Sequence, residues 1–418
     1  MALLFLCLIF GTGRTQKIEA AVQNVPESLE EESRLDTVGT DQETERAAVR
    51  EKKGQQEKEA GDTETDQAAA AQDELLVELD FDAIQQEVDS LLSSQQFSFA
   101  GTVRSLLQDG DPFRTFRAGN AVLSCAKTAF LAQKGLMKEL FLLVLAGAVL
   151  GSFSSLFEGK QVRDASFYMV YLLALALILK NFQSSGENLK AVITSLVAFM
   201  RILTPSYYLA AAAAGGASSA VMFYQMLLLV ILAVEKLLLA LVLPMIHIYL
   251  LIALVNDLSG EEILSHMTEL LETCVNGLLK SSLGVLVGMQ MIRNLIAPAL
   301  DSLRQMALWR TAGMIPGIGN AVNAVTELVA GSAVLIRNCF GVTAMLVLLA
   351  AGMVPAVQLL VSGLSFRLLA AAAQPVSDKR IAGCLAAAGK GYAMLLRLLL
   401  TVEILFLLTI AILAGTFS

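Results

Sequence analysis

Histidine is almost absent from the 418-residue chain, which holds only His247 and His266. Its five cysteines are widely spaced and form no Cys-x-x-Cys pair. Zinc sites are built from clustered cysteine and histidine ligands and disulfide scaffolds from paired cysteines, so the sequence carries the signature of neither. The apolar surroundings of the cysteines instead predict small, buried apolar side chains.

Charged residues are also scarce, at 16% of the chain, against about 25% in an ordinary soluble protein. Hydrophobic residues reach 56%, and the mean hydropathy is +0.64. The charges are unevenly divided: residues 1–89 carry a net charge of −14 and residues 90–418 one of +6, which gives −8 for the chain. An acidic, polar leader therefore precedes a mildly basic and very apolar body. This pattern predicts a membrane protein and disfavours a soluble enzyme.

The N-terminus begins with an apolar run, MALLFLCLIF, that is too short to span a bilayer. Residues 1–21 are a possible export signal peptide, although no lysine or arginine precedes the run, as is usual in such signals. The alternatives are a short membrane-associated segment or a wrongly set start codon. Residues 22–78 cannot bury enough apolar surface to offset their ordering entropy, so we expect a disordered acidic leader.

Residues 79–133 form the next region, in which we expect amphipathic helices. Ile84, Val88 and Leu91 recur at helical spacing and predict a short helix near residues 83–92. A helix with one apolar face requires a partner surface to cover it.

Residues 134–418 form the predicted multi-pass membrane domain. Six apolar runs are the firm span candidates, most of them near the ~20 residues that a bilayer core requires: residues 140–153, 166–182, 207–234, 237–255, 341–364 and 395–415. Four shorter or charge-interrupted runs are ambiguous: residues 191–203, 282–300, 326–336 and 365–373. The expected fold is all-α, a polytopic helical membrane protein with about six to eight membrane segments.

Two charged features bear on the topology. The pair Glu235–Lys236 predicts a turn between two spans. Basic residues mark cytoplasmic loops, and the cluster between Arg367 and Arg397 predicts that the last loop is cytoplasmic. The bases in residues 104–138 favour the inside for the region before the first span, whereas an export signal would place it outside. Both orientations remain open.

Residues 263–278 predict an amphipathic helix. Such a helix either lies at the membrane interface and docks a partner, or packs within its own bundle.

The most distinctive local motif is MIPGIGN at residues 314–320, with Pro316, Gly317, Gly319 and Asn320. Its glycines permit positive φ and a close approach of the backbone to a ligand. A dinucleotide fingerprint would need a third glycine where the chain has Val322, and no Gly-Lys-Ser/Thr follows. We therefore expect a tight break between two helices and no bound cofactor.

Four ionisable side chains interrupt the apolar body: Glu327, Arg337, Glu403 and His247. Ionisable groups in a bilayer are costly and often line a pathway or pair with one another. Glu403 either faces a polar interior or a partner subunit, or it snorkels or packs beside a neighbouring polar group. For His247 we favour a hydrogen bond to a neighbouring helix over a proton relay.

No Ser/His/Asp set, pair of catalytic carboxylates or metal cluster emerges from the sequence. We therefore predict no catalytic, cofactor-binding or metal-binding residues, and a protein that is not an enzyme.

Three segments together resemble a known family: residues 205–208 (PSYY), 257–261 (DLSGE) and 311–338 (TAGMIPGIGNAVNAVTELVAGSAVLIRN). The chain resembles the stage III sporulation protein AE family of endospore-forming bacteria, from about residue 79 to the C-terminus. The resemblance implies a multi-pass protein of the mother-cell membrane around the forespore. It also implies an assembly with the other stage III A operon proteins, including a secretion-ATPase-like and ring-forming members, and with stage II sporulation protein Q across the intermembrane space.

Two functions follow as hypotheses. The first is a non-enzymatic subunit of a transenvelope sporulation channel or secretion-like complex, required for spore development after engulfment. The second is a secondary transporter that moves a small solute, because broken helices rich in small residues commonly form substrate sites. No convincing repeat relates the two halves of the body, which weakens the second.

Overall fold

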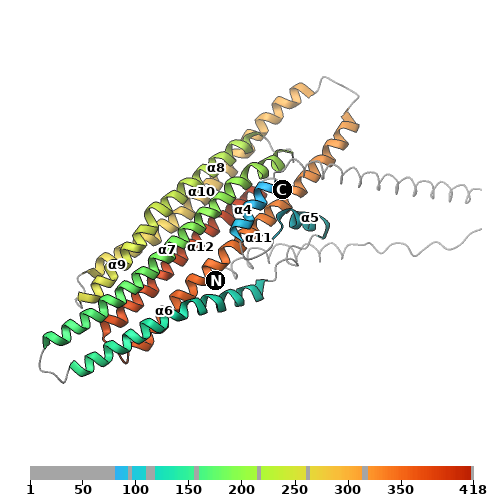
Figure 1. The fold of residues 1–418 in the computed structure, drawn as a ribbon. Coiled ribbons are helices and arrows are strands. Elements are labelled where there is room, and N and C mark those ends of the chain that lie inside the picture. The colour runs from blue at the N-terminus through green and yellow to red at the C-terminus, as the bar shows by residue number, and fades with distance from the viewer. Residues whose placement is uncertain are drawn as a thin grey trace, which may run out of the picture. The chain divides into compact units, whose positions relative to one another are not determined.

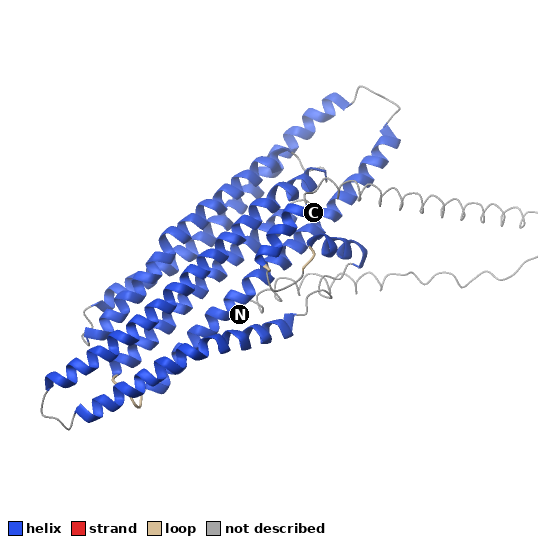
Figure 2. Cartoon of the chain, viewed as in Figure 1, coloured by secondary structure: helices blue, strands red, loops and turns tan. Residues whose placement is uncertain are grey.

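A computed structural model describes residues 81–92, 97–109, 118–154, 160–213, 218–259, 264–312 and 319–415. Within these residues every regular element is a helix and none is a strand, as Figure 2 shows. The all-α class is therefore confirmed. The possible signal at residues 1–21 and the leader at residues 22–78 lie outside the described residues.

Two short amphipathic helices come first, α4 (Phe81–Leu91) and α5 (Phe99–Asp109). Ile84 and Val88 on α4 are fully buried, and α4 packs against α5 and the long helix α7. Gln85 ties the two short helices together: its Nε2 donates to the carbonyl oxygen of Phe97 at 2.7 Å, and its Oε1 accepts from the Phe99 amide at 2.8 Å.

The remaining elements are long helices that run alongside one another (Figure 1). They are α6 (Ala118–Ser154), α7 (Lys160–Ala213), α8 (Ser218–Leu237), the π-helical turn η1 (Leu238–Val242), α9 (Leu243–Ser259), α10 (Ser265–Ala312), α11 (Gly319–Ala373) and α12 (Lys379–Gly415). The most extensive packing is between α11 and α12.

Five helical stretches among the described residues are long and apolar enough to cross a membrane: Tyr168–Tyr207, Leu228–Ser259, Ser265–Ile292, Ala333–Ala373 and Lys379–Ala411. Large apolar side chains remain exposed on these helices, among them Leu229, Met291 and Leu360. Exposed apolar side chains on membrane-length helices are what a lipid solvent favours. The chain is thus a multi-pass membrane protein.

Several predicted segments join into longer helices. Residues 166–182 and 191–203 both belong to α7, and residues 263–278 and 282–300 fall almost entirely in α10. The polar residues between the paired runs do not end the helix, because helical backbone groups bond within the segment whatever the side chains are. The interfacial helix and the half-length span expected around α10 are therefore one continuous element.

The predicted turn at Glu235–Lys236 is wrong. Both residues lie in the last turn of α8, and the helix continues through η1 into α9. The Leu243 amide donates to the Leu238 carbonyl, five residues back, as in a π-turn. Pro244 follows and has no N–H to give to the preceding turn, so the wider turn lies where a regular ladder would be interrupted.

The predicted first span, residues 140–153, lies in α6, which is not among the five membrane-length stretches. Its apolar run rises only about 21 Å, against a hydrocarbon core of about 30 Å. Lys134, Lys138 and Glu139 precede it directly.

Side-chain pairings fix the directions of three helices. Tyr171 of α7 donates to the carbonyl oxygen of Leu254 at 2.5 Å, and further along α7 Phe182 meets His247, so α7 and α9 are antiparallel. Asp257 lies against Gly383 of α12, and Leu250 against Gly391, so α9 and α12 are antiparallel as well. Helices α7 and α12 therefore run in the same direction.

The last two directions follow from contacts with α12. Lys390 pairs with Glu272 and Arg397 with Asn276, so α10 and α12 are parallel. Helix α11 is antiparallel to α12, because Gly352 meets Glu403 while Gly363, later in α11, meets the earlier residue Tyr392. Neighbouring passes along the chain thus alternate in direction from α7 to α12.

Candidate functional site

The interior of the bundle holds a polar layer around Tyr392 of α12, a fully buried side chain. Asn181 of α7 donates its amide to the Tyr392 hydroxyl at 2.6 Å, and the Ser185 hydroxyl lies 3.2 Å from the same oxygen. The ring stacks on Phe366 with centroids 5.3 Å apart and meets Phe182 edge-on at 5.2 Å. Phenol and amide are thus mutually satisfied inside an aromatic cage, as buried polar groups require.

His247 lies beside this layer, and its ring centroid is 5.3 Å from that of Phe182. Its Nδ1 lies 2.9 Å from the carbonyl oxygen of Leu243 on its own helix. Its Nε2 faces Gly186 of α7, where a Cβ would overlap the ring. The hydrogen bond within the described residues therefore goes to the residue's own turn, and not to a neighbouring helix as the sequence suggested. The contacts with α7 are the edge-on packing against Phe182 and the close fit over Gly186.

Glu403 of α12 is only 7% exposed. Both carboxylate oxygens lie directly against the Cα of Gly352 on α11, so that an added Cβ would overlap them. Among the described residues no basic side chain pairs with this carboxylate. The carboxylate thus sits inside the bundle at the α11–α12 interface, packed against a glycine.

Helices α11 and α12 cross closely at Gly363 and Gly389. A Cβ built on Gly389 would lie 3.2 Å from the Gly363 carbonyl oxygen, and one on Gly363 would lie 3.2 Å from the Cβ of Tyr392. Small residues allow such close backbone approach in membrane helix pairs. Tyr392 lies at this crossing, whereas Glu403 meets α11 further along, at Gly352.

The remaining predicted site residues concern α11. Gly319 and Asn320 begin this helix, Glu327 follows in its third turn, and Arg337 is 1% exposed further on. Pro316 and Gly317 lie outside the described residues, between the end of α10 and the start of α11. Glu327 and Arg337 therefore share one helix with Gly352.

A second polar level lies between α10 and α12. Lys390 Nζ and Glu272 Oε2 are 2.5 Å apart, and Lys390 also lies 5.9 Å from the centroid of the Tyr249 ring. Seven residues along α12, Arg397 donates to Asn276 Oδ1 at 3.1 Å. These pairs fix the parallel register of the two helices.

Sequence reasoning missed Asn181, Ser185 and Tyr392. The signal was present, because Asn181 and Ser185 lie one helical turn apart in the polar stretch of α7. Spacing of this kind indicates a common helix face, and a common polar face inside an apolar helix indicates a bundle interior. Tyr392 could not be matched to them, since it lies more than 200 residues away.

The chemistry available to this interior is limited. Within the described residues no group of three or more His, Cys, Asp or Glu side chains is placed to hold a metal ion. Among the described residues the buried polar side chains are the Arg337 guanidinium, the Glu403 carboxylate, tyrosine phenols such as that of Tyr392, and several serine and threonine hydroxyls, whereas Asn181 and His247 are half-buried. The class defined by this fold and interior is a polytopic helical membrane protein with isolated polar groups between its passes.

Comparison with known proteins gives the particular family. A sequence profile of stage III sporulation protein AE matches residues 97–416, and the chain belongs to this family. Stage III sporulation protein AE of Bacillus subtilis (strain 168) is 22% identical over 291 residues, which is 69% of this chain and 73% of the relative. No solved structure matches the chain. The family expected from residues 311–338 is thereby confirmed, and it supports a role in sporulation.

Proposed function

We propose that this chain is a non-enzymatic integral membrane subunit of a transenvelope sporulation channel or secretion-like complex between mother cell and forespore. The observation that carries the proposal is the family match over residues 97–416, which takes in all five membrane-length stretches. Such a subunit needs packed passes rather than a reaction centre. The closely packed α11–α12 pair, with its glycine crossing, suits a platform within an assembly.

The proposal includes a place and partners. The chain lies in the mother-cell membrane that surrounds the forespore. It assembles with the other stage III A operon proteins, including the secretion-ATPase-like and ring-forming members, and with stage II sporulation protein Q across the intermembrane space. Exposed apolar faces such as that of Leu229, Leu241 and Ile248 on α8–α9 supply surface for lipid or for neighbouring subunits.

The test is deletion of the gene in the endospore-forming host, with the wild-type gene returned at a second locus. We expect engulfment to finish, late forespore reporter expression to fail and heat-resistant spores to fall by several orders of magnitude. Return of the wild-type gene should restore all three readouts. Normal spore counts in the deletion strain, or a block before engulfment is complete, would contradict the proposal.

A secondary transporter is the second candidate. The observation that favours it is a buried carboxylate, Glu403, in the otherwise apolar half of α12, since such groups often mark pathways. Purified protein in liposomes should then move a solute by itself, and Glu403→Gln or Glu327→Gln should abolish the flux. A chain that moves nothing alone, yet co-purifies with the operon partners, favours the subunit.

A further inference from the structure

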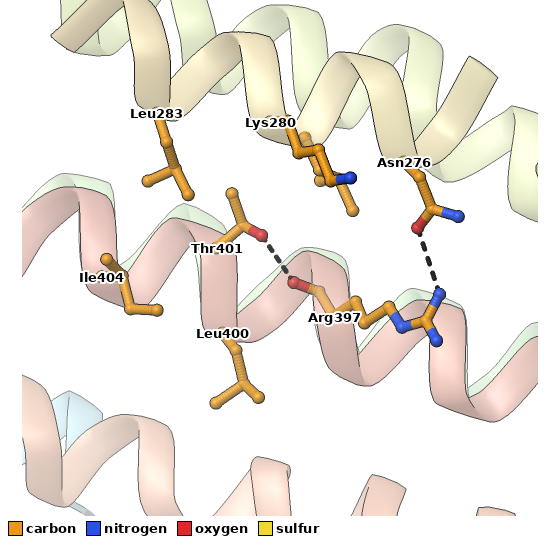
Figure 3. A pocket seen from close by; sticks show the side chains of 8 residues that line it. Asn276, Lys280, Leu283, Arg397, Leu400, Thr401 and Ile404 are labelled. Carbon is orange, nitrogen blue, oxygen red and sulfur yellow. Dashed lines mark hydrogen bonds between the residues drawn. The ribbon is translucent and has the colours of Figure 1, made fainter. Parts of the chain in front are cut away.

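A groove of about 460 Å³ runs between the parallel helices α10 and α12. Its lining comes from one face of each helix: Asn276, Leu279, Lys280, Leu283, Arg397, Leu400, Thr401 and Ile404. Figure 3 shows Asn276, Lys280 and Arg397 toward one end of the groove, Leu283 and Ile404 at the other, and Thr401 between them. The groove is therefore amphipathic along its length.

The polar end carries positive charge. Arg397 uses one amino group on Asn276 Oδ1 at 3.1 Å, and a guanidinium has five N–H donors in all. Lys280 is exposed, and in the part of the chain that the structure describes neither cation has a carboxylate partner. The nearby acid Glu272 is already paired with Lys390. The polar end thus presents two uncompensated cations.

The apolar end continues directly from these cations. Ile404 follows Arg397 by seven residues, a rise of about 10 Å, and Leu283 follows Lys280 by one turn on the neighbouring helix. Thr401, between the two ends, turns its hydroxyl back to the Arg397 carbonyl at 2.8 Å, so this group does not need a partner in the groove. A chain of methylene groups fits this end.

The change from polar to apolar occurs at the same level on both helices. After Lys280, α10 has no charged residue until Arg293. After Arg397, α12 has only Glu403, which is buried against Gly352 on α11. The 18 residues that remain in α12 rise about 27 Å, close to the thickness of a hydrocarbon core. Lys280 and Arg397 therefore mark the same change from polar to apolar on the two helices, part-way along the membrane-length stretches Ser265–Ile292 and Lys379–Ala411.

We propose that this groove binds one anionic phospholipid. Its phosphate is held by Arg397 and Lys280, and the first part of an acyl chain lies on Leu283, Leu400 and Ile404. Charge complementarity favours this occupant, because the two cations of the groove contact a single anionic headgroup. The apolar wall contacts the acyl chain. A zwitterionic lipid would bring its own cation toward Lys280. The site is independent of the channel proposal and concerns the lipid that this subunit carries.

The test uses the full chain in detergent, with native mass spectrometry of added phosphatidylglycerol and of phosphatidylcholine with the same acyl chains. We expect phosphatidylglycerol to bind at least about fivefold more tightly. The double substitution Lys280→Gln with Arg397→Gln should remove this preference. The control, Lys180→Gln with Lys236→Gln, removes two exposed cations elsewhere and should keep it. Equal loss in both double variants, or no preference in the wild type, would overturn the proposal.

Two further variants separate the site from general effects. Lys280→Gln alone breaks no hydrogen bond or ion pair within the described residues, so it should fold normally and still weaken phosphatidylglycerol binding about fivefold. Leu283→Trp fills the apolar end and should weaken lipid binding without changing the charge. A Leu283→Trp variant that binds phosphatidylglycerol as the wild type does would overturn the assignment of the tail.

Two other occupants are outcomes of the same experiment. Soluble glycerol phosphate that competes as strongly as the lipid would show a free phosphate site, with no role for the apolar wall. A photo-reactive residue at Thr401 should capture lipid in membranes. If it captures polypeptide instead, from a second copy or a partner, the groove is a protein interface and the lipid assignment is wrong.

Discussion

The carboxylate of Glu403 packs directly on the Cα of Gly352, across the interface of α11 and α12. This contact needs a glycine, because any Cβ at position 352 would overlap the carboxylate oxygens. It also determines the location of the acid, which is buried between two helices and not directed to lipid. The pair is therefore the most direct test of the described packing.

Gly352→Ala should destabilise the protein in detergent by about 1–3 kcal/mol, since the added methyl overpacks the interface. Thermal unfolding of the purified chain would measure it. Gly284→Ala is the matched control: its added Cβ meets nothing within 4 Å, so the better helix propensity of alanine should leave stability unchanged or raise it by up to about 1 kcal/mol.

Glu403→Ala should recover part of the stability that Gly352→Ala loses, because it removes the overlapping atoms. Residues in contact are non-additive in this way. If the two losses simply add, the contact between Gly352 and Glu403 is not as described.

Tyr392→Phe should cost stability through the loss of the hydroxyl that accepts from Asn181. Hydrogen bonds between membrane helices average about 0.6 kcal/mol in double-mutant cycles. We expect a coupling of that order between Tyr392→Phe and Asn181→Leu, read from thermal unfolding of the two single variants and the double variant. A coupling near zero would indicate that the two side chains do not meet.

Gln85→Ala should loosen α5, since Gln85 accepts the hydrogen bond of the Phe99 amide and donates to the Phe97 carbonyl. Loss of about 1 kcal/mol corresponds to roughly fivefold faster hydrogen exchange over α5. The neighbouring residue Gln86 is exposed, and Gln86→Ala should leave exchange unchanged. Equal exchange in the wild type and in both variants would show that Gln85 does not hold α5 to α4.

Labelling from the two faces of the membrane tests the direction of α12. In a chain without native cysteines, Gln374→Cys should react from the cytoplasmic side, because Arg367, Lys379 and Arg380 flank it. Gly415→Cys, at the far end of α12, should react from the opposite side. Reaction of both from one side would mean that α12 does not cross.

The class of this protein could be predicted from sequence because hydropathy and helical spacing are local properties. The bounds of the helices could not be predicted in this way. Residues 183–190 of α7 are mostly polar and looked like a gap between two apolar runs, yet the helix passes through them. The bundle tolerates the polar face of this segment because Asn181 and Ser185 lie within hydrogen-bonding distance of the Tyr392 hydroxyl, a partner that only tertiary packing provides.

The candidate site, too, could be predicted from the sequence only in part. Glu403 stood out as an acid in apolar sequence, and it is buried. Gly352 did not stand out, because one glycine among the 30 of the chain has no local signature of contact. The roles of Glu327 and Arg337, and of the motif around Pro316, Gly317, Gly319 and Asn320, remain predictions.

The π-turn at Leu238–Val242 has a consequence for how this chain tolerates changes of length. A bond that reaches five residues back encloses one residue more than an α-helical turn, and each residue turns the helix by about 100°. Deleting one residue inside η1 should return it to a regular α-turn and keep Ile246, Leu250 and Leu254 facing inward. Deleting one residue of α9 before Ile246 should rotate those three by about 100° relative to α8, so η1 should tolerate the loss of a residue better than the regular turn that follows it.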